Sequence, residues 1–288
     1  MPKLNTCSKV VNILDLLDLY DLFLFDLWGV IIQGPGLYPR AKILLDEICA
    51  KKSVMFISNT SGSKSATCNK LASLGLSVSQ DMIITSGELT KRMLSDPAQY
   101  FDITNPHIYN FGLEGNAELW QQLSMPTTDN LQQAGVMVIS LCMVKEDIQP
   151  AIYDTLKRAA ELKIPAICAN SDRVWHEEGR VIYCAGHFAE KYESFGGKVY
   201  YMGKPFEPIF LEALKSYPQI SKERTLMIGD TLETDVLGAN KVGICSALVT
   251  TGNMLALCKE ASDEVHMLQK INFEVEKLNL QLNHVAKL

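Results

Sequence analysis

The sequence lacks three features that would each point to a particular class of protein. No apolar run reaches the ~18 residues of a membrane-spanning helix. Asp15, Asp18 and Asp21 interrupt the apolar N-terminal stretch that a signal peptide would need. No block of Lys or Arg occurs and the net charge is −6, whereas nucleic-acid-binding surfaces need clustered cations. We therefore expect a cytoplasmic protein that binds neither membranes nor nucleic acid.

The cysteines also form no CxxC pair, which argues against a zinc ribbon or a redox site of that type. Several of the eight, such as Cys168 and Cys245, lie within apolar runs, where a reduced cysteine acts as a small apolar residue. Reduced cysteines are typical of the cytosol. With 288 residues, 47% of them hydrophobic, the chain is sufficient for one large or two moderate soluble domains.

Short apolar runs alternate with longer amphipathic segments along much of the chain. The predicted strands lie at 22–26, 53–60, 82–88, 198–205 and 244–252. The predicted helices lie at 41–52, 64–75, 187–197 and 207–217, and residues 224–239 read as a strand, a turn and a helix. This alternation predicts an α/β fold, a Rossmann-like doubly wound parallel sheet with helices on both faces. The tail after residue 252 predicts a helix and a last strand near His284 and Val285.

The middle of the chain carries an α/β pattern of its own. Three strands are predicted near residues 108, 135 and 164, with helices at 114–123 and 150–162. We therefore expect an inserted α/β cap domain at residues 87–184. The core domain would then consist of residues 1–86 together with 185–288.

Polar residues follow the predicted core strands at the points where they end. Asp26 ends the first strand, Ser58 the second, Lys204 a later one and Asp230 the next, with Asp235 five residues further on. In an open parallel sheet, ligands bind outside the carboxyl ends of the strands. Each stretch alone is typical of a turn or a helix cap, but their occurrence in this order favours a common site.

The residue types in this set restrict the chemistry. Asp26 and Asp230 would repel one another unless a cation lies between them, and oxygen ligands favour Mg²⁺ over zinc. Lys204 and Ser58 can bind an anion, and a lysine suits phosphate. A carboxylate nucleophile, magnesium and anion donors together predict phosphoryl transfer through an aspartyl-phosphate.

The four stretches FDLWGV, ISNTS, GKP and MIGDTLETD resemble the signatures of the haloacid dehalogenase (HAD) superfamily of hydrolases. The insertion between the second and third stretches is similar to the type 2 cap of the NagD-like and pyridoxal phosphatase-like branch. DLWGV together with CANSDRV and YCAGHFAEKYE resembles an uncharacterised subfamily of these hydrolases. The resemblance extends from about Tyr20 to Gly252.

The resemblance implies a role for each matching residue. Asp26 would be the nucleophile and a magnesium ligand, Asp230 a second ligand, and Lys204 the charge that neutralises the nucleophile and the phosphoryl oxygens. Asp235 would support Lys204 or the waters of the metal. Ser58 and the backbone amides of Asn59 and Thr60 would bind the phosphate.

The resemblance also implies a substrate and a role for the cap. The substrate would be a small phosphorylated metabolite, and residues of the cap would select its leaving group. Asn170, Asp172 and Arg173 either contact that substrate or form a structured turn at a strand end. Caps of this class often carry a dimer surface, so a homodimer through the cap is a further expectation.

Trp28 departs from the family pattern. The family has an aspartate there, which protonates the leaving oxygen and then activates water. An indole offers only a hydrogen-bond donor, and loss of a general acid–base typically costs ~10²–10⁴ in rate. The main-chain carbonyl of residue 28, which the family uses as a magnesium ligand, is retained.

Four interpretations follow from Trp28. The protein is a phosphatase with another proton donor, or one whose substrate has an activated leaving group. It is a carbon–halogen or carbon–phosphorus hydrolase, since some such HAD enzymes lack this aspartate. It is a non-catalytic protein that binds a phosphorylated ligand. Last, it is a response-regulator-like receiver, which the motif order and the insertion disfavour. We favour the first.

Overall fold

The computed structural model describes residues 7–100, 105–112, 123, 125–177 and 180–288. These residues form two compact units. The described residues of the first unit fall within Met1–Ser58, Thr67–Ile84 and Lys204–Leu288, and those of the second within Asn59–Ala66 and Thr85–Gly203. Most of the helix predicted at 114–123 lies outside the described residues.

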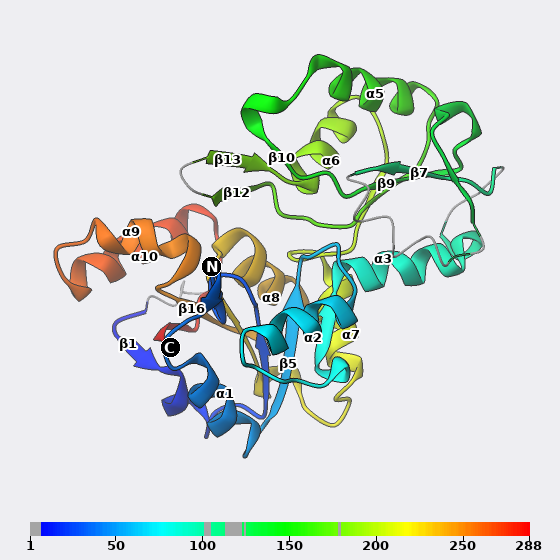
Figure 1. Ribbon diagram of the computed structural model, residues 1–288. Helices are drawn as coiled ribbons and strands as arrows, with labels where there is room; N and C mark the ends of the chain where they lie inside the picture. Colours follow the sequence, from blue (N-terminus) through cyan, green and yellow to red (C-terminus); the bar gives the residue numbers. More distant parts are fainter. Residues whose placement is uncertain (1–6, 101–104, 113–122, 124, 178–179) are drawn as a thin grey trace. The chain divides into compact units, whose positions relative to one another are not determined.

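A seven-stranded sheet forms the centre of the first unit (Figure 1), and its strand order is β1-β17-β16-β15-β2-β5-β6. The strands are β1 Val10–Asn12, β2 Leu22–Phe25, β5 Ser53–Ser58, β6 Ile83–Thr85, β15 Thr225–Gly229, β16 Cys245–Val249 and β17 His284–Lys287. The pairings from β1 through to β5 are all parallel. From β2 the chain proceeds to β5 and β6 on one side, and later to β15 and β16 on the other. The order therefore reverses at β2, which is where such sheets bind ligands.

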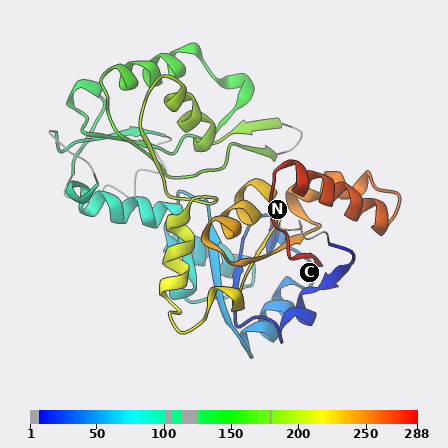
Figure 2. The same cartoon turned by 180° about the vertical axis from the view of Figure 1, so that it is seen from behind.

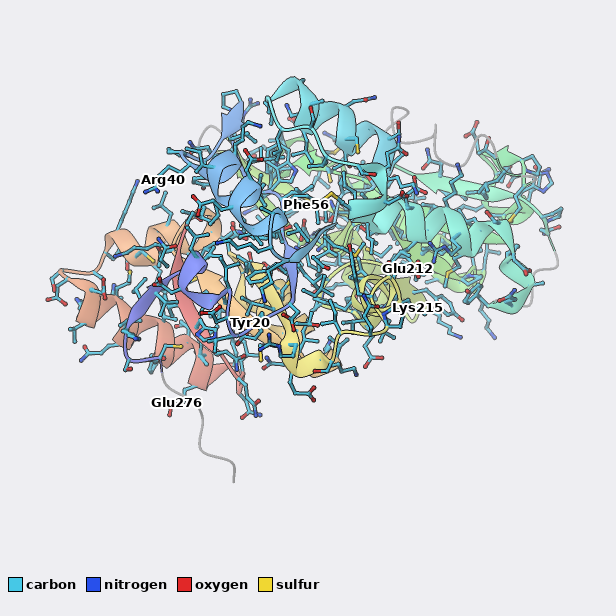
Figure 3. The ribbon with its side chains drawn as sticks, turned by 90° about the horizontal axis from the view of Figure 1, so that it is seen from below. Tyr20, Arg40, Phe56, Glu212, Lys215 and Glu276 are labelled. Atoms are coloured by element: carbon cyan, nitrogen blue, oxygen red, sulfur yellow. The ribbon has the colours of Figure 1, made fainter. Side chains whose placement is uncertain are left out.

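Helices cover both faces of this sheet. The helices of the first unit are α1 Ala41–Cys49, α2 Lys64–Ser73 from Thr67 onward, α7 Glu207–Lys215, α8 Leu237–Val242, α9 Leu255–Lys259 and α10 Glu264–Lys277. Phe23 and Phe25 pack in one apolar cluster with residues of α1 and α2, whereas Leu248 packs with α10 in another. Seen from behind, α7 crosses the opposite face (Figure 2). Phe56 on β5 lies in the interior and Arg40 projects at the surface (Figure 3). The doubly wound α/β fold is thus confirmed.

A five-stranded parallel sheet organises the second unit, in the order β14-β11-β9-β7-β8. The strands are β7 Ile108–Phe111, β8 Thr127–Thr128, β9 Val136–Ile139, β11 Ala166–Cys168 and β14 Val199–Tyr201. Two of its helices, α5 Pro150–Glu161 and α6 Ala185–Ser194, pack on this sheet in one apolar cluster. A third helix of this unit is α3 Ser86–Ser95, and a small antiparallel sheet joins β10 Met143–Val144, β13 Arg180–Tyr183 and β12 Val174–Glu177.

The two units differ from the expected domain boundaries on both sides of the insertion. Asn59–Ala66 and residues 85–86, expected in the core domain, belong to the second unit. Residues 185–203 were expected in the core domain, but they belong to the second unit. The reason is that Val199 to Tyr201 pair with β11 of the second sheet. Phe188 and Tyr192 of α6 are also buried in the apolar cluster of that unit.

Several short elements have no counterpart in the sequence prediction. They include β1, the two-residue strands β3 Ile32–Gln33 and β4 Gly36–Leu37, and the β12–β13 hairpin. The predicted tail is confirmed, because α10 precedes the last strand β17. Among the residues that the structure describes, no helix has the length and apolar character needed to cross a bilayer.

Candidate active site

The carboxyl ends of β15, β2 and β5 lie next to each other in the first unit. Phe25 at the end of β2 pairs with Ile228 on one side and Phe56 on the other. Asp26 comes next, and its backbone N–H donates to the Ile228 carbonyl at 2.9 Å. Ser58 ends β5 at the same edge and is buried. The sheet register thus brings Asp26, Ser58 and the residue after β15 to one edge, as predicted.

Lys204 is buried between two carboxylates of this edge. Its Nζ lies 2.6 Å from Oδ1 of Asp26 and 2.7 Å from Oδ1 of Asp235. Lys204 is only 2% exposed and Asp235 is 1% exposed. Asp235 belongs to a π-helical turn, Leu232–Val236, and its other oxygen accepts the Thr231 backbone N–H at 3.1 Å. This turn therefore holds the Asp235 carboxylate near the end of β15, where it pairs with Lys204.

Asp230 completes the group from the end of β15. Its Oδ2 accepts the Asn253 backbone N–H at 2.6 Å and its Oδ1 accepts the Thr231 hydroxyl at 3.1 Å. One oxygen each from Asp26, Asp230 and Asp235 lies within 4.8 Å of the others. Asp26, Asp230, Asp235 and Lys204, which were predicted to share a site, therefore lie together in the structure.

The site holds more negative than positive charge, and burial makes this costly. Burial raises the pKa of Asp26 well above its usual range; Lys204 opposes the rise, while Asp235 and Asp230 add to it. Burial and the neighbouring Asp235 charge raise the pKa of Asp230 to about 7. Burial alone would lower the pKa of Lys204, but Asp235 and Asp26 outweigh this and leave it raised. One ammonium therefore does not balance three carboxylates.

This arrangement suits a divalent cation. Buried carboxylates whose ionised forms repel one another are stabilised by a cation between them. The donors are all oxygen atoms, which Mg²⁺ prefers over softer ligands. The residues of the first unit therefore fit the magnesium site that the sequence predicts.

The predicted phosphate-binding stretch after β5 passes into the second unit, where its side chains have structural partners. The Asn59 side chain donates to Asp172 Oδ1 at 2.7 Å. The Thr60 hydroxyl accepts the Gly62 backbone N–H at 3.2 Å, and its carbonyl accepts the Gly87 N–H at 3.1 Å. Binding of phosphate by the backbone amides of Asn59 and Thr60 stays a prediction.

Two of the three predicted cap residues, Asn170 and Asp172, form a turn after β11, while their contact with substrate stays a prediction. Asn170 Oδ1 accepts the Asp172 backbone N–H at 2.9 Å, which closes a turn directly after β11. Arg173 is exposed, and its Nε lies 3.0 Å from Glu190 Oε1 on α6. The structure thus brings Asp172 to Asn59, but it directs Arg173 to a different partner.

Trp28 lies in a turn whose backbone is held on both sides. The Ile31 and Ile32 N–H groups donate to the Leu27 carbonyl at 2.8 Å, and the Gly29 N–H donates to the Ile32 carbonyl at 3.0 Å. These bonds involve no side chain of residue 28, and Trp28 itself is 37% exposed. These main-chain hydrogen bonds would therefore remain possible with another side chain at residue 28.

Two glycines that the sequence analysis missed make room for Asp230. A Cβ on Gly29, which has a φ of +84°, would lie 2.1 Å from Oδ2 of Asp230, and one on Gly252 would lie 1.9 Å from it. The Thr251 hydroxyl also donates to the Gly29 carbonyl at 2.6 Å. The available signal was the stretch TTGN after β16, because β16 is the neighbour of β15 and its loop reaches the same edge.

Two family profiles match the chain. One, described as haloacid dehalogenase-like hydrolase, matches residues 23–124, and the other, described as HAD-hydrolase-like, matches residues 201–270. The two matches cover the strand ends that carry Asp26 and Asp230. Together they span more than half of the sequence.

Individual proteins also resemble this chain over most of its length. Bovine chronophin is 27% identical over 239 residues, which are 80% of each chain. Sugar-phosphatase AraL of Bacillus subtilis is 25% identical over 80% of this chain and 83% of its own. A crystal structure of a possible sugar phosphatase from Cytophaga hutchinsonii superposes with a TM-score of 0.77 at 26% identity, and covers 96% of this chain and 97% of its own.

Proposed function

Because the chain belongs to the haloacid dehalogenase-like hydrolases, we propose that it is a magnesium-dependent phosphatase for a small phosphorylated metabolite. The observation that carries the proposal is the buried Lys204 between Asp26 and Asp235, with Asp230 close by. The names of AraL and of the Cytophaga hutchinsonii protein support a phosphate ester of a small molecule as substrate.

Asp26 would carry out the nucleophilic step. Lys204 contacts Oδ1 of Asp26, which leaves Oδ2 as the candidate attacking atom. Attack on phosphorus would form the Asp26 aspartyl-phosphate as the bond to the leaving oxygen breaks. Water would then attack the phosphorus, release inorganic phosphate and restore the carboxylate. Lys204 would balance charge on Asp26 and on the transferring oxygens throughout, held in place by Asp235.

The predicted magnesium ligands are Asp26, Asp230 and the main-chain carbonyl of Trp28, with Asp235 in a supporting position. A divalent ion bound there supplies positive charge that stabilises the phosphoryl oxygens. Ser58 would donate to the same oxygens from the end of β5.

Trp28 restricts which substrates react well. An indole cannot protonate a leaving alkoxide or deprotonate water. A leaving group that departs as a stable anion, as from an aryl phosphate or an acyl phosphate, needs no such acid. We therefore propose an activated phosphate as the preferred substrate class.

The central test is hydrolysis of an aryl phosphate with and without Mg²⁺ by the wild type and by Asp26→Asn. We expect slow, Mg²⁺-dependent turnover that Asp26→Asn abolishes. Asp46→Asn, which changes an exposed carboxylate on α1, is the matched control and should leave the rate unchanged. An Asp26→Asn variant as active as the wild type would refute the nucleophile assignment.

A second test concerns the position of the missing acid. Trp28→Asp should raise turnover on alkyl phosphates while changing turnover on aryl phosphates less, because only the former need protonation. A general acid–base typically contributes ~10²–10⁴ in rate. No gain on alkyl phosphates by a folded variant would show that position 28 is not simply a vacant acid site.

Trp28 also favours one alternative, a protein that binds a phosphorylated ligand without hydrolysing it. Such a protein would be stabilised against thermal unfolding by inorganic phosphate and Mg²⁺, because ligands that bind the native state raise its stability. It would show no turnover on any phosphate ester. Stabilisation together with Asp26-dependent turnover would exclude this alternative.

A further inference from the structure

Two cysteines lie opposite one another where β10 meets the start of α6. The antiparallel register pairs Met143 with Tyr183, so the next pair along the two chains is Cys142 and Cys184. Directly opposite residues on antiparallel strands have Cα atoms about 4.5–5.5 Å apart, within the roughly 4.4–6.8 Å of disulfides. Both cysteines are free, and each thiol shifts the pKa of the other, as expected for two neighbouring sulfurs.

The two sulfurs differ in their surroundings. Cys142 is partly exposed, and its sulfur lies near the backbone N–H of Ala185, the first residue of the ten-residue helix α6. The Cys184 thiol, and secondarily this N–H, lower the pKa of Cys142, in the direction expected near a helix N-terminus. Cys184 is buried, and Cys142 and burial raise its pKa. Cys142 is thus the more accessible of the two thiols, and Cys184 is its buried neighbour.

A third cysteine in the same region lacks these features. Cys168 is buried, and its thiol donates to the Asn170 carbonyl at 3.1 Å. Burial is the largest cause that raises its pKa. Cys168 therefore offers an internal comparison for reactivity.

We propose that Cys142 and Cys184 are a modification site, a dithiol that peroxide converts reversibly to a disulfide. The Cys142 thiolate attacks one oxygen of hydrogen peroxide, the O–O bond breaks, and the departing hydroxide takes up a proton to become water. The Cys184 sulfur then attacks the Cys142 sulfenic acid, the S–O bond breaks, and the oxygen leaves as a second water. Two thiols lose two hydrogen atoms while one peroxide is reduced to two waters. A dithiol reductant reverses the reaction.

The disulfide would act on the turn formed by residues 170–173. The Cys184 backbone N–H donates to the Arg173 carbonyl, and the Gly186 N–H donates to the Asp172 carbonyl, each at 3.0 Å. The fit is close, because a Cβ on Gly186 would lie 2.4 Å from the Ser171 carbonyl oxygen. A bond that fixes the start of α6 to β10 should therefore reduce opening of this turn. The proposal does not depend on phosphatase activity, since both of its readouts are structural.

The test is a peptide map of the full chain after oxidation. Reduced protein is treated with hydrogen peroxide, its remaining thiols are blocked with N-ethylmaleimide, and trypsin is added. Cys142, Cys168 and Cys184 fall in separate tryptic peptides, 93–145, 164–173 and 181–191. We expect a cross-linked pair of 93–145 with 181–191, lighter by two hydrogen atoms than the two free peptides, that dithiothreitol removes. This wild-type result requires no variant to fold.

Variants and hydrogen exchange complete the experiment. Cys142→Ser and Cys184→Ser should each abolish the cross-linked pair, whereas Cys168→Ser, the matched control, should leave it. Backbone exchange in 170–173 should slow on oxidation and recover on reduction. Equal N-ethylmaleimide labelling of both peptides with and without peroxide, or a cross-link from Cys142 to Cys168, would overturn the assignment. Unchanged exchange in the cross-linked protein would overturn the coupling to the turn.

Discussion

Replacement of Lys204 by methionine tests how the candidate site holds its charge. Lys204 is 2% exposed and contacts Asp26 at 2.6 Å and Asp235 at 2.7 Å. Methionine retains much of the side-chain length but carries no charge. The variant therefore leaves two buried carboxylates without the ammonium between them, beside a third on Asp230.

The expected loss of stability is large. Removing one partner from a buried ion pair typically costs about 3–5 kcal/mol, since the remaining charge is uncompensated. The whole free energy of unfolding of a domain is only about 5–15 kcal/mol. The loss should shrink at pH 5, because the carboxyl groups then take up protons and lose the repulsion. It should also shrink with Mg²⁺, because a cation can replace part of the missing charge.

The assay is urea unfolding at pH 8 in EDTA, at pH 5 in EDTA, and at pH 8 with excess Mg²⁺. Lys52→Met is the matched control, because Lys52 lies 2.8 Å from Asp21 in a partly exposed pair. Exposed pairs contribute about 0.2–1 kcal/mol, and neither pH 5 nor Mg²⁺ should restore that small loss. A midpoint shift without a change in slope would show that stability, and not the unfolded state, has changed.

Two outcomes would contradict the reasoning. One is a Lys204→Met variant that loses no more stability at pH 8 than Lys52→Met, which would mean that the carboxylates are not held by the ammonium. The other is an equal loss at pH 5, pH 8 and with Mg²⁺. That result would indicate a packing defect in place of an uncompensated charge.

Three further predictions concern the same two units. Gly29→Ala should lower stability in unfolding and Mg²⁺ affinity in calorimetric titration, because its Cβ would lie 2.1 Å from Oδ2 of Asp230. Gly34→Ala is the control, since Gly34 also has a positive φ but open space around it; it should lose only the stability that backbone strain costs and should keep its Mg²⁺ affinity. Without metal, burial raises the pKa of Asp230 in the folded protein to about 7, from the 3.8 of an ordinary aspartate. The stability that protonated Asp230 contributes should therefore be fully present below about pH 4 and be lost as the pH rises through 7. Asp230→Asn should flatten that part of the pH profile of the melting temperature. Asn59→Ala should cost about 1.5–3 kcal/mol in urea unfolding by removing its bond to Asp172; a loss below ~0.5 kcal/mol would show that this bond does not hold the turn.

The part of the site that the sequence predicts best is the part that strand order determines. Each of Asp26, Ser58 and Asp230 ends or follows a buried apolar strand. Parallel strands present their carboxyl ends at one edge, so a residue at each end is enough to place the group. Lys204 and Asp235 were also named among the polar residues near the predicted strand ends, and the hydrogen bond between them agrees with the supporting role that the resemblance implied for Asp235.

The features that the sequence did not predict depend on contacts between distant segments. Gly29 and Gly252 both border Asp230; the stretch TTGN indicates a loop at this edge, but the sequence does not show that this loop meets Gly29. Strand β1 has three residues and pairs with β17 at the other end of the chain. Residues 185–203 were expected in the core because the helix and strand there continue the same alternation, which does not reveal the sheet to which a strand belongs.

Trp28 is the position where the roles of the backbone and of the side chain matter most for function. The hydrogen bonds around it run between Leu27, Gly29, Ile31 and Ile32, and the Thr251 hydroxyl, in the loop after β16, donates to the Gly29 carbonyl. None of them involves the indole, so a substitution at residue 28 should leave the turn and its carbonyl in place. A change in rate for Trp28→Asp would then report proton transfer alone, and an unchanged Mg²⁺ affinity would verify that the turn was retained. If Mg²⁺ affinity falls together with the rate, the side chain contributes to the shape of the turn and the two roles of residue 28 are not separable.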